Sequence, residues 1–202
     1  MDYTRIAHGI SWVLHPFLLP SYFLALLLTF TAFSAFPWSV KLYFVWVVVL
    51  YTIVIPVFSM FLLRKFGFLT DYKIDIRRER IIPLLVGAVC YIMCAITVAQ
   101  IPSAAVVRKF MMAAAACELV CLVVSLKWKI SLHLTGMGAM VALVALLNIV
   151  DLANLIIPLA LAVFGAGLLA SARLYLGCHK PAQIIAGFLC GVVVSILTVL
   201  FL

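Results

Sequence analysis

Long apolar stretches dominate this sequence and leave it few possible folds. Seven segments are apolar over roughly 20 residues, the length an α-helix needs to cross about 30 Å of hydrocarbon. The 202-residue chain is 68% hydrophobic and only 10% charged, so it carries more apolar surface than a water-soluble domain could bury. The predicted spans are residues 17–36, 40–63, 82–99, 104–126, 132–150, 152–170 and 181–202.

These segments predict an all-α fold, a polytopic bundle of about seven transmembrane helices that forms a single domain over residues 1–202. Only Asn148, Asp151 and Asn154 separate the fifth span from the sixth. One continuous helix there would have roughly 40 residues, too many for a bilayer, so we expect a tight hairpin. Six spans are the alternative. No cleavage site follows the first residues, and we expect the first span itself to direct insertion.

The basic residues are distributed unevenly between the predicted loops. The net charge is +8, but the charges lie in short loops between spans, which points to membrane orientation and anionic lipids rather than to nucleic acid. Seven spans place the N-terminus and the loops after spans two, four and six on one face. The positive-inside rule then predicts that this face is cytoplasmic, most simply in a bacterial inner membrane. Its eleven basic residues are Arg5, Arg64, Lys65, Lys73, Arg77, Arg78, Arg80, Lys127, Lys129, Arg173 and Lys180, against Lys41, Arg108 and Lys109 on the other face.

Three loops on this face carry residues suited to phosphoryl chemistry. They span residues 70–83, 129–133 and 171–191, and they contain His133, His179 and several cations. Cations stabilise the oxygens of a transferring phosphoryl group, and histidine can act as nucleophile or proton donor near neutral pH. Arg173 can hold two phosphate oxygens at once, because its guanidinium presents a planar fork of donors.

The third loop resembles the last signature of the type 2 phosphatidic acid phosphatase superfamily, Ser-Arg-x5-His-x3-Asp followed by two glycines. Arg173 precedes His179 by six residues, and Gly187 and Gly191 follow Gln183 at the expected spacings. The order of the three loops and their common face also resemble that family.

The other two loops resemble the earlier signatures of the same family. Ser131 and His133 stand where the family has Pro-Ser-Gly-His, and Lys73 and Arg80 have the spacing of its Lys-x6-Arg-Pro. Leu132 replaces the glycine of the second signature, and the proline of the first arrives late, at position 83.

The resemblance implies a specific set of roles. His179 would be the nucleophile that forms a phosphohistidine, and His133 the general acid. No metal or cofactor is expected. The substrates would be lipid phosphates such as phosphatidate, phosphatidylglycerophosphate or polyprenyl phosphate and diphosphate. The residues that would bind the phosphate are Lys73, Arg80, Arg173 and Ser131.

One departure from the family concerns catalysis directly. Gln183 stands where the family has an aspartate that orients the nucleophilic imidazole. A glutamine carbonyl can still accept a hydrogen bond from the ring, but it carries no charge, and the comparable change in a serine protease triad lowers turnover about 10⁴-fold. The alternative is therefore a catalytically inactive protein that binds or transports a lipid phosphate.

A third hypothesis is a prenyltransferase of the UbiA type, which holds magnesium diphosphate between aspartate-rich motifs. Asp71 and Asp75 have the spacing of one such motif, but no second one follows. Glu118, in the middle of the fourth span, is costly at that depth and predicts a function or a structural hydrogen bond.

Several remaining residues are interpreted structurally. His8 and His15 are assigned to an interfacial segment that Trp12 anchors. Gly187 and Gly191, four residues apart, also favour close helix packing. The six cysteines are interpreted as small residues of helix interfaces, because none has zinc-site spacing.

Overall fold

The computed structural model describes residues 2–68, 77–101, 104–150 and 154–202, and every regular element in these ranges is helical. Short 3₁₀ turns occur at Ala32–Ala35 and Arg77–Arg80, and a π-helical stretch at Leu50–Val54. The α-helices are α1 (Tyr3–Val13), α2 (Leu19–Phe30), α3 (Trp38–Val49), α4 (Ile55–Lys65), α5 (Ile81–Val98), α6 (Ala105–Ser125), α7 (Leu132–Ile149), α8 (Ile156–Tyr175) and α9 (Pro181–Phe201).

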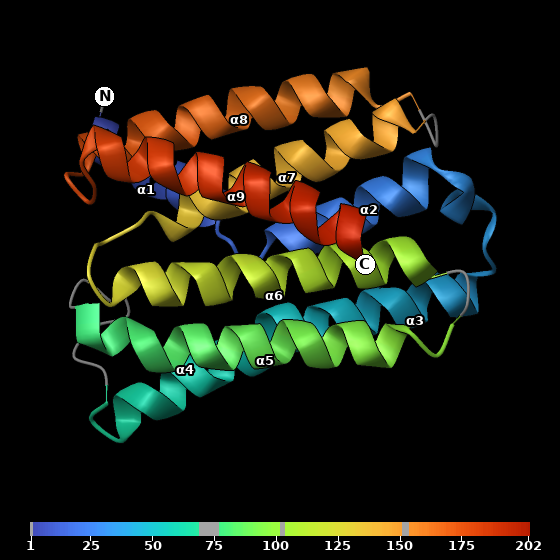
Figure 1. Cartoon of the computed structure of the whole chain (residues 1–202), viewed down its shortest axis with the longest axis horizontal. Coiled ribbons are helices and arrows are strands. Elements are labelled where there is room, and N and C mark those ends of the chain that lie inside the picture. The colour runs from blue at the N-terminus through green and yellow to red at the C-terminus, as the bar shows by residue number, and fades with distance from the viewer. Residues whose placement is uncertain (1, 69–76, 102–103, 151–153) are drawn as a thin grey trace.

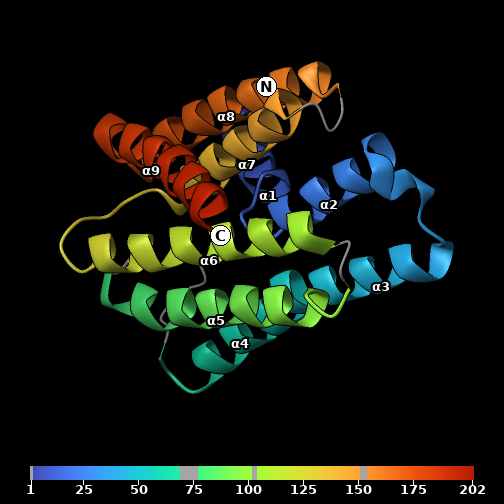
Figure 2. The same ribbon diagram turned by 45° about the vertical axis from the view of Figure 1, so that its right-hand side comes forward.

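The long helices run side by side along the longest axis of the molecule (Figure 1). Turning the view separates α7, α8 and α9 from α3, α4 and α5, with α6 in contact with both groups (Figure 2). The N-terminus, the α6–α7 loop, the α8–α9 loop and the start of α5 lie at one end of the bundle, on the left of Figure 1. We call it the motif end, because the predicted signature loops meet there.

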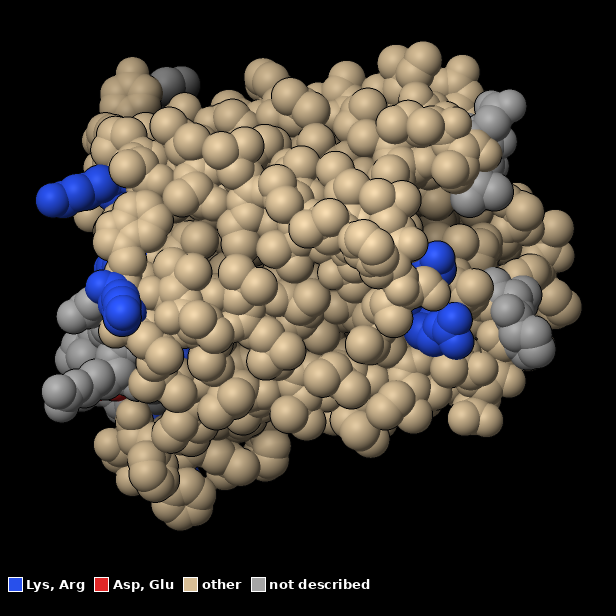
Figure 3. Space-filling model, viewed as in Figure 1, with Lys and Arg blue, Asp and Glu red and all other residues tan. Residues whose placement is uncertain are grey.

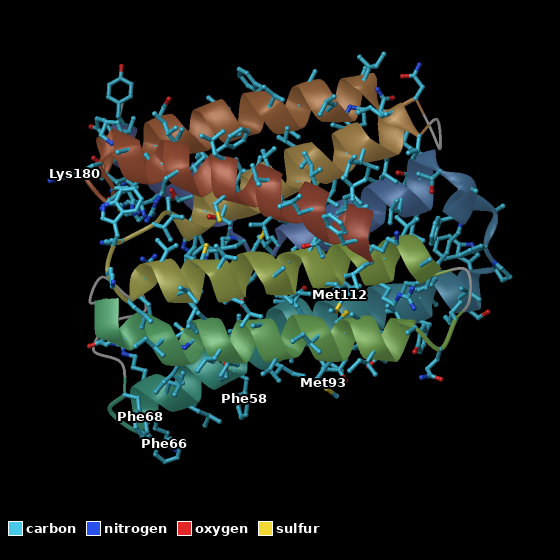
Figure 4. All side chains as sticks on the ribbon, viewed as in Figure 1. Phe58, Phe66, Phe68, Met93, Met112 and Lys180 are labelled. Carbon is cyan, nitrogen blue, oxygen red and sulfur yellow. The ribbon has the colours of Figure 1, made fainter. Side chains whose placement is uncertain are left out.

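Five helical segments of the described chain are long and apolar enough to cross a membrane: Trp38–Lys65, α5, α7, α8 and α9. Large apolar side chains cover their outer faces, and Phe58 and Met93 point outward from α4 and α5 (Figure 4). Lysine and arginine atoms appear toward the two ends of the molecule, with an uncharged belt between them (Figure 3). These features indicate an integral membrane protein.

The second predicted span, residues 40–63, corresponds to the continuous helical segment Trp38–Lys65. Pro56 lacks the N–H that would continue the α-helical hydrogen bonding, and the π-helical stretch directly before it accommodates this gap. The first predicted span, residues 17–36, contains a shorter helix than expected, since α2 has 12 residues. It ends where the Thr31 hydroxyl accepts a hydrogen bond from the N–H of Phe33 and begins a 3₁₀ turn.

The remaining predicted spans match single helices. The fourth corresponds to α6, which is 21 residues long but carries Arg108, Lys109 and Glu118. The fifth and sixth are separate helices, α7 and α8, which confirms the predicted break. Asn148 stabilises this break, because its side-chain oxygen accepts a hydrogen bond of 3.0 Å from the N–H of Leu155.

Helices α7 and α9 pack at very short range through glycine. A Cβ atom on Gly187 would lie 2.6 Å from the Ser131 carbonyl oxygen. A Cβ atom on Gly191 would collide with the carbonyl oxygen of Thr135. The close packing predicted from the spacing of these glycines is therefore confirmed. Of the cysteines predicted to lie in helix interfaces, Cys117 does so, since its Sγ lies 3.6 Å from the hydroxyl of Ser195 in α9. For Cys178 the prediction is wrong, because this residue lies in the turn after α8.

Candidate functional site

A cavity of about 1210 Å³ opens among α1, α4, α5, α6, α7 and the α8–α9 loop. Most of its wall is apolar and includes Leu84, Phe110 and Met140. Its polar residues gather toward the motif end, where Arg80, the second and third signature loops and the start of the chain meet. We call this part the cationic end; its residues are His15, Arg80, Lys129, His133, Arg173 and His179.

The turn after α8 brings Arg173 and His179 to the same cavity. Gly177 has a φ of +64°, which glycine adopts without strain. The N–H of Cys178 bonds to the carbonyl of Arg173 at 3.2 Å, and the N–H of Gly177 to that of Leu174 at 2.9 Å. These two bonds form a Schellman motif, which reverses the chain at the helix end. The predicted pairing of Arg173 with His179 therefore has a local backbone cause.

Gln183 has a structural role at the start of α9. Its Oε1 accepts a hydrogen bond of 2.9 Å from the N–H of Lys180, one half of a capping box. Pro181 at the first helical position supports the same start. Gln183 also lies beside the His179 ring, where its side chain acts to raise the pKa of that histidine. The glutamine thus contacts the predicted nucleophile, while its oxygen serves the helix cap.

Arg80 connects the first signature loop with the second. It is 5% exposed, and its Nη1 donates a hydrogen bond of 3.2 Å to the carbonyl of Ile130. The arginine therefore lies at the cavity beside the α6–α7 loop. Its predicted companion Lys73 lies outside the described residues, as do Asp71 and Asp75 of the prenyltransferase hypothesis.

Ser131 and His133 are two residues apart in sequence but differ in their relation to the cavity. His133 lines the cavity, with its ring beside the backbone of Ser11 in α1. Ser131 is fully buried against Gly187 of α9 and does not line the cavity. Of the residues predicted to bind phosphate, Arg80 and Arg173 therefore line the same cavity as both histidines. Ser131 instead lies in the contact between α7 and α9.

Buried polar atoms without a partner in the described part of the chain occur at Arg173 and His179 of the cationic end. Arg173 Nε and His179 Nδ1 are both buried and make no hydrogen bond. Buried polar atoms are almost always hydrogen-bonded in folded proteins, so such atoms at a cavity wall mark a place where a ligand can complete the bonding. A guanidinium donates only, and imidazole can donate or accept, which together suit an oxygen-rich anion.

The environment of His179 keeps its imidazole neutral. Burial, followed by the positive charges of Arg173, Arg80 and Lys129, lowers the pKa of His179 from 6.5 to about 4. The side chain of Gln183 acts in the opposite direction but does not restore the ordinary pKa. A neutral imidazole has a free lone pair near pH 7, which a nucleophile requires.

His15, which the sequence assigned to an interfacial segment, also lies at the cationic end of the cavity. It lies between α1 and α2, and its ring meets that of His133 edge-on with 5.1 Å between centroids. Its Nδ1 accepts a hydrogen bond of 3.3 Å from the N–H of Phe17, which leaves Nε2 as the protonated nitrogen. Burial, and next the charge of Arg173, lower the pKa of His15 to about 4. The sequence feature that indicates this position is the His15-Pro16 pair, because a proline directly after a short amphipathic segment predicts that the helix ends there.

Glu118 also lines the cavity, in the part away from the cationic end. In the described ranges, no group of three or more His, Cys, Asp or Glu side chains could hold a metal ion. Comparisons of this chain with protein-family models, with curated proteins and with solved structures give no match.

Proposed function

We propose that this protein binds a lipid phosphate, with the phosphate at the cationic end and the hydrocarbon in the apolar part of the cavity. The observation that carries the proposal is the pair of buried atoms without partners, Arg173 Nε and His179 Nδ1, in the wall of one large apolar cavity. A phosphate monoester offers acceptor oxygens to the arginine. Its tail would occupy space lined by apolar side chains of α4, α5, α6 and α7.

The proposed reaction is hydrolysis or transfer of that phosphate through His179. The neutral imidazole of His179 attacks phosphorus, and the bond from phosphorus to the lipid oxygen breaks. His133 gives its proton to the departing oxygen, and Arg80 and Arg173 stabilise the charge on the phosphoryl oxygens. In the second step His133 takes a proton from water, which attacks the phosphohistidine and breaks the bond from phosphorus to the ring nitrogen. Phosphate is released, His179 recovers its neutral imidazole, and His133 recovers the proton that it gave to the lipid oxygen. This assignment of roles follows the resemblance to the type 2 phosphatidic acid phosphatases and needs no metal.

The test is phosphate release by the purified chain in detergent from phosphatidate, phosphatidylglycerophosphate and polyprenyl diphosphate, with and without magnesium and vanadate. We expect metal-independent release that vanadate inhibits and that His179→Ala abolishes. Retained release in a folded His179→Ala protein would contradict the reaction. Arg108→Ala removes an exposed arginine at the opposite end and is the matched control for changes at the cationic end.

A binder or transporter without catalysis is the second candidate, and the position of Gln183 favours it. The Oε1 atom of Gln183 is occupied by the N–H of Lys180, so it is less free to orient the His179 ring. Tight binding of lipid phosphates without phosphate release by the wild-type chain would establish this second function.

The proposal for topology is that α2 and α6 complete seven crossings, with the motif end in the cytoplasm of a bacterial cell. Support comes from the distribution of basic residues and from α9, which runs away from the end where the N-terminus lies (Figure 1). Reporter fusions at the two termini test this arrangement: seven crossings place them on opposite sides, and reporters on one side would contradict it.

A further inference from the structure

Glu118 lines the cavity well below the cationic end, and the proposed reaction gives it no role. Contacts between α6 and α7 fix its depth, because Cys121 Sγ lies 3.4 Å from Thr135 Oγ1. His133 is two residues nearer the motif end than Thr135, and Glu118 is three residues farther from it than Cys121. At 1.5 Å per helical residue, Glu118 lies about 8 Å deeper than His133.

A glycine on the neighbouring helix makes room for the Glu118 carboxyl group. A Cβ atom on Gly87 of α5 would lie 2.7 Å from Glu118 Cδ and would collide with Oε2. Oε2 is buried, and no hydrogen bond or ion pair to Glu118 occurs among the residues that the structure describes. Tyr91, one turn from Gly87, and Phe110, two turns from Glu118 on α6, line the same cavity. The carboxyl group is therefore accommodated by α5 but has no protein partner.

A buried carboxyl group without a hydrogen-bond partner lowers stability, so its presence at this depth indicates a function. A ligand that offers a hydrogen-bonding group beside Glu118 would supply the missing interaction. In a glycerophospholipid, the glycerol and its ester groups follow the phosphate directly. In a polyprenyl phosphate, hydrocarbon follows instead and offers the carboxyl group nothing to bind.

We propose that Glu118 selects lipid phosphates whose linkage region carries oxygen, such as phosphatidate, against polyprenyl phosphates. This inference rests on the proposed lipid-phosphate site and specifies its substrate class. A protonated carboxyl group donates to an ester carbonyl, and either form accepts from a hydroxyl. Sites that hydrogen-bond a ligand discriminate strongly against analogues that lack the bonding group, because the buried protein group is then left without a partner.

The experiment measures equilibrium binding to the full chain in detergent of the phosphonate analogues of dioleoyl phosphatidate and geranylgeranyl monophosphate, whose P–C bond the proposed reaction does not break. We expect the wild type to prefer phosphatidate at least tenfold. Glu118→Leu removes this preference because it lowers the affinity for phosphatidate, while the affinity for geranylgeranyl phosphate stays unchanged within twofold. Glu118→Gln, which still hydrogen-bonds, keeps most of the preference. Gly87→Ala displaces the carboxyl group without removing it and lowers the preference in the same direction.

Other outcomes overturn the inference in distinguishable ways. If Glu118→Leu lowers the affinity for both lipids equally, Glu118 has a general structural role. If the wild type binds geranylgeranyl phosphate more tightly than phosphatidate, the proposed selection is contradicted directly. If neither lipid binds the wild type, the proposed function itself fails. Thr198→Val removes a hydroxyl of α9 outside the cavity lining and serves as the matched control, with both affinities unchanged.

Discussion

The two polar parts of the cavity are held in place by different means. At the cationic end, backbone hydrogen bonds of the α8–α9 turn position Arg173 and His179. At the deep end, one side chain, Glu118, lies against the bare backbone of Gly87 on another helix. Local backbone geometry therefore determines the first part, and packing between two helices determines the second. Changes at the cationic end should affect every lipid phosphate, whereas changes at the deep end should affect only the choice among them.

The largest effect is expected from Arg173→Ala. Loss of the guanidinium removes a charge-assisted hydrogen bond to phosphate, and we expect every lipid phosphate to bind about 10- to 100-fold more weakly. Equilibrium binding of the phosphonate analogues of phosphatidate and geranylgeranyl phosphate checks this, with Arg108→Ala as the control that keeps wild-type affinity. A loss confined to one of the two lipids would contradict the division between the two parts of the cavity.

Gly191→Ala tests the packing behind the cationic end. The added methyl group would meet the Thr135 carbonyl, and backbone cannot yield as a flexible side chain can. We expect a loss of stability of about 1–3 kcal/mol, seen as a lower unfolding temperature in detergent. Gly167→Ala is the control, because a Cβ atom on Gly167 of α8 meets nothing within 4 Å. Equal unfolding temperatures for the two variants would show that α7 and α9 are not in close contact.

The third effect is a dependence of stability on pH. The pKa of His179 is about 4 in the folded chain and 6.5 in the unfolded chain, so below pH 6.5 the unfolded chain binds the proton more readily. The contribution of His179 to the free energy of unfolding is therefore fully present above pH 6.5. It is lost as the pH falls from 6.5 toward 4, by up to about 1.4 kcal/mol per pH unit. Thermal unfolding between pH 7.5 and 4.5 checks this. His179→Gln should show a shallower decline than the wild type, and parallel declines would contradict the low pKa.

The sequence predicted those features that depend on nearby residues. The break between α7 and α8, the close packing at Gly187 and Gly191, and the pairing of Arg173 with His179 all follow from short spacings or local turns. The place of His15 at the cavity was not predicted, because it depends on how α1 packs against α8 and on the contact of its ring with His133. The helical face of Glu118 could not be predicted either, since α6 carries small and apolar residues on all its sides.

The smallest effect is expected from Gly177→Ala. This variant distinguishes the role of the turn in positioning His179 from its contribution to stability. Alanine at a φ of +64° costs roughly 1 kcal/mol, and Gly67, with a φ of +78° after α4, provides a matched control because a Cβ atom meets nothing at either position. Both alanine variants should lower the unfolding temperature by a similar few degrees.

Only Gly177→Ala should also weaken the binding of both lipids, by a few-fold, because the turn at Gly177 carries His179 back toward Arg173. The preference for phosphatidate should stay as in the wild type, since Glu118 is held by α5 and not by this turn. If Gly67→Ala weakens binding as much, backbone strain alone explains the loss. If instead the preference changes in Gly177→Ala, the two parts of the cavity are coupled, and the loop that holds the phosphate also sets the depth at which the lipid lies.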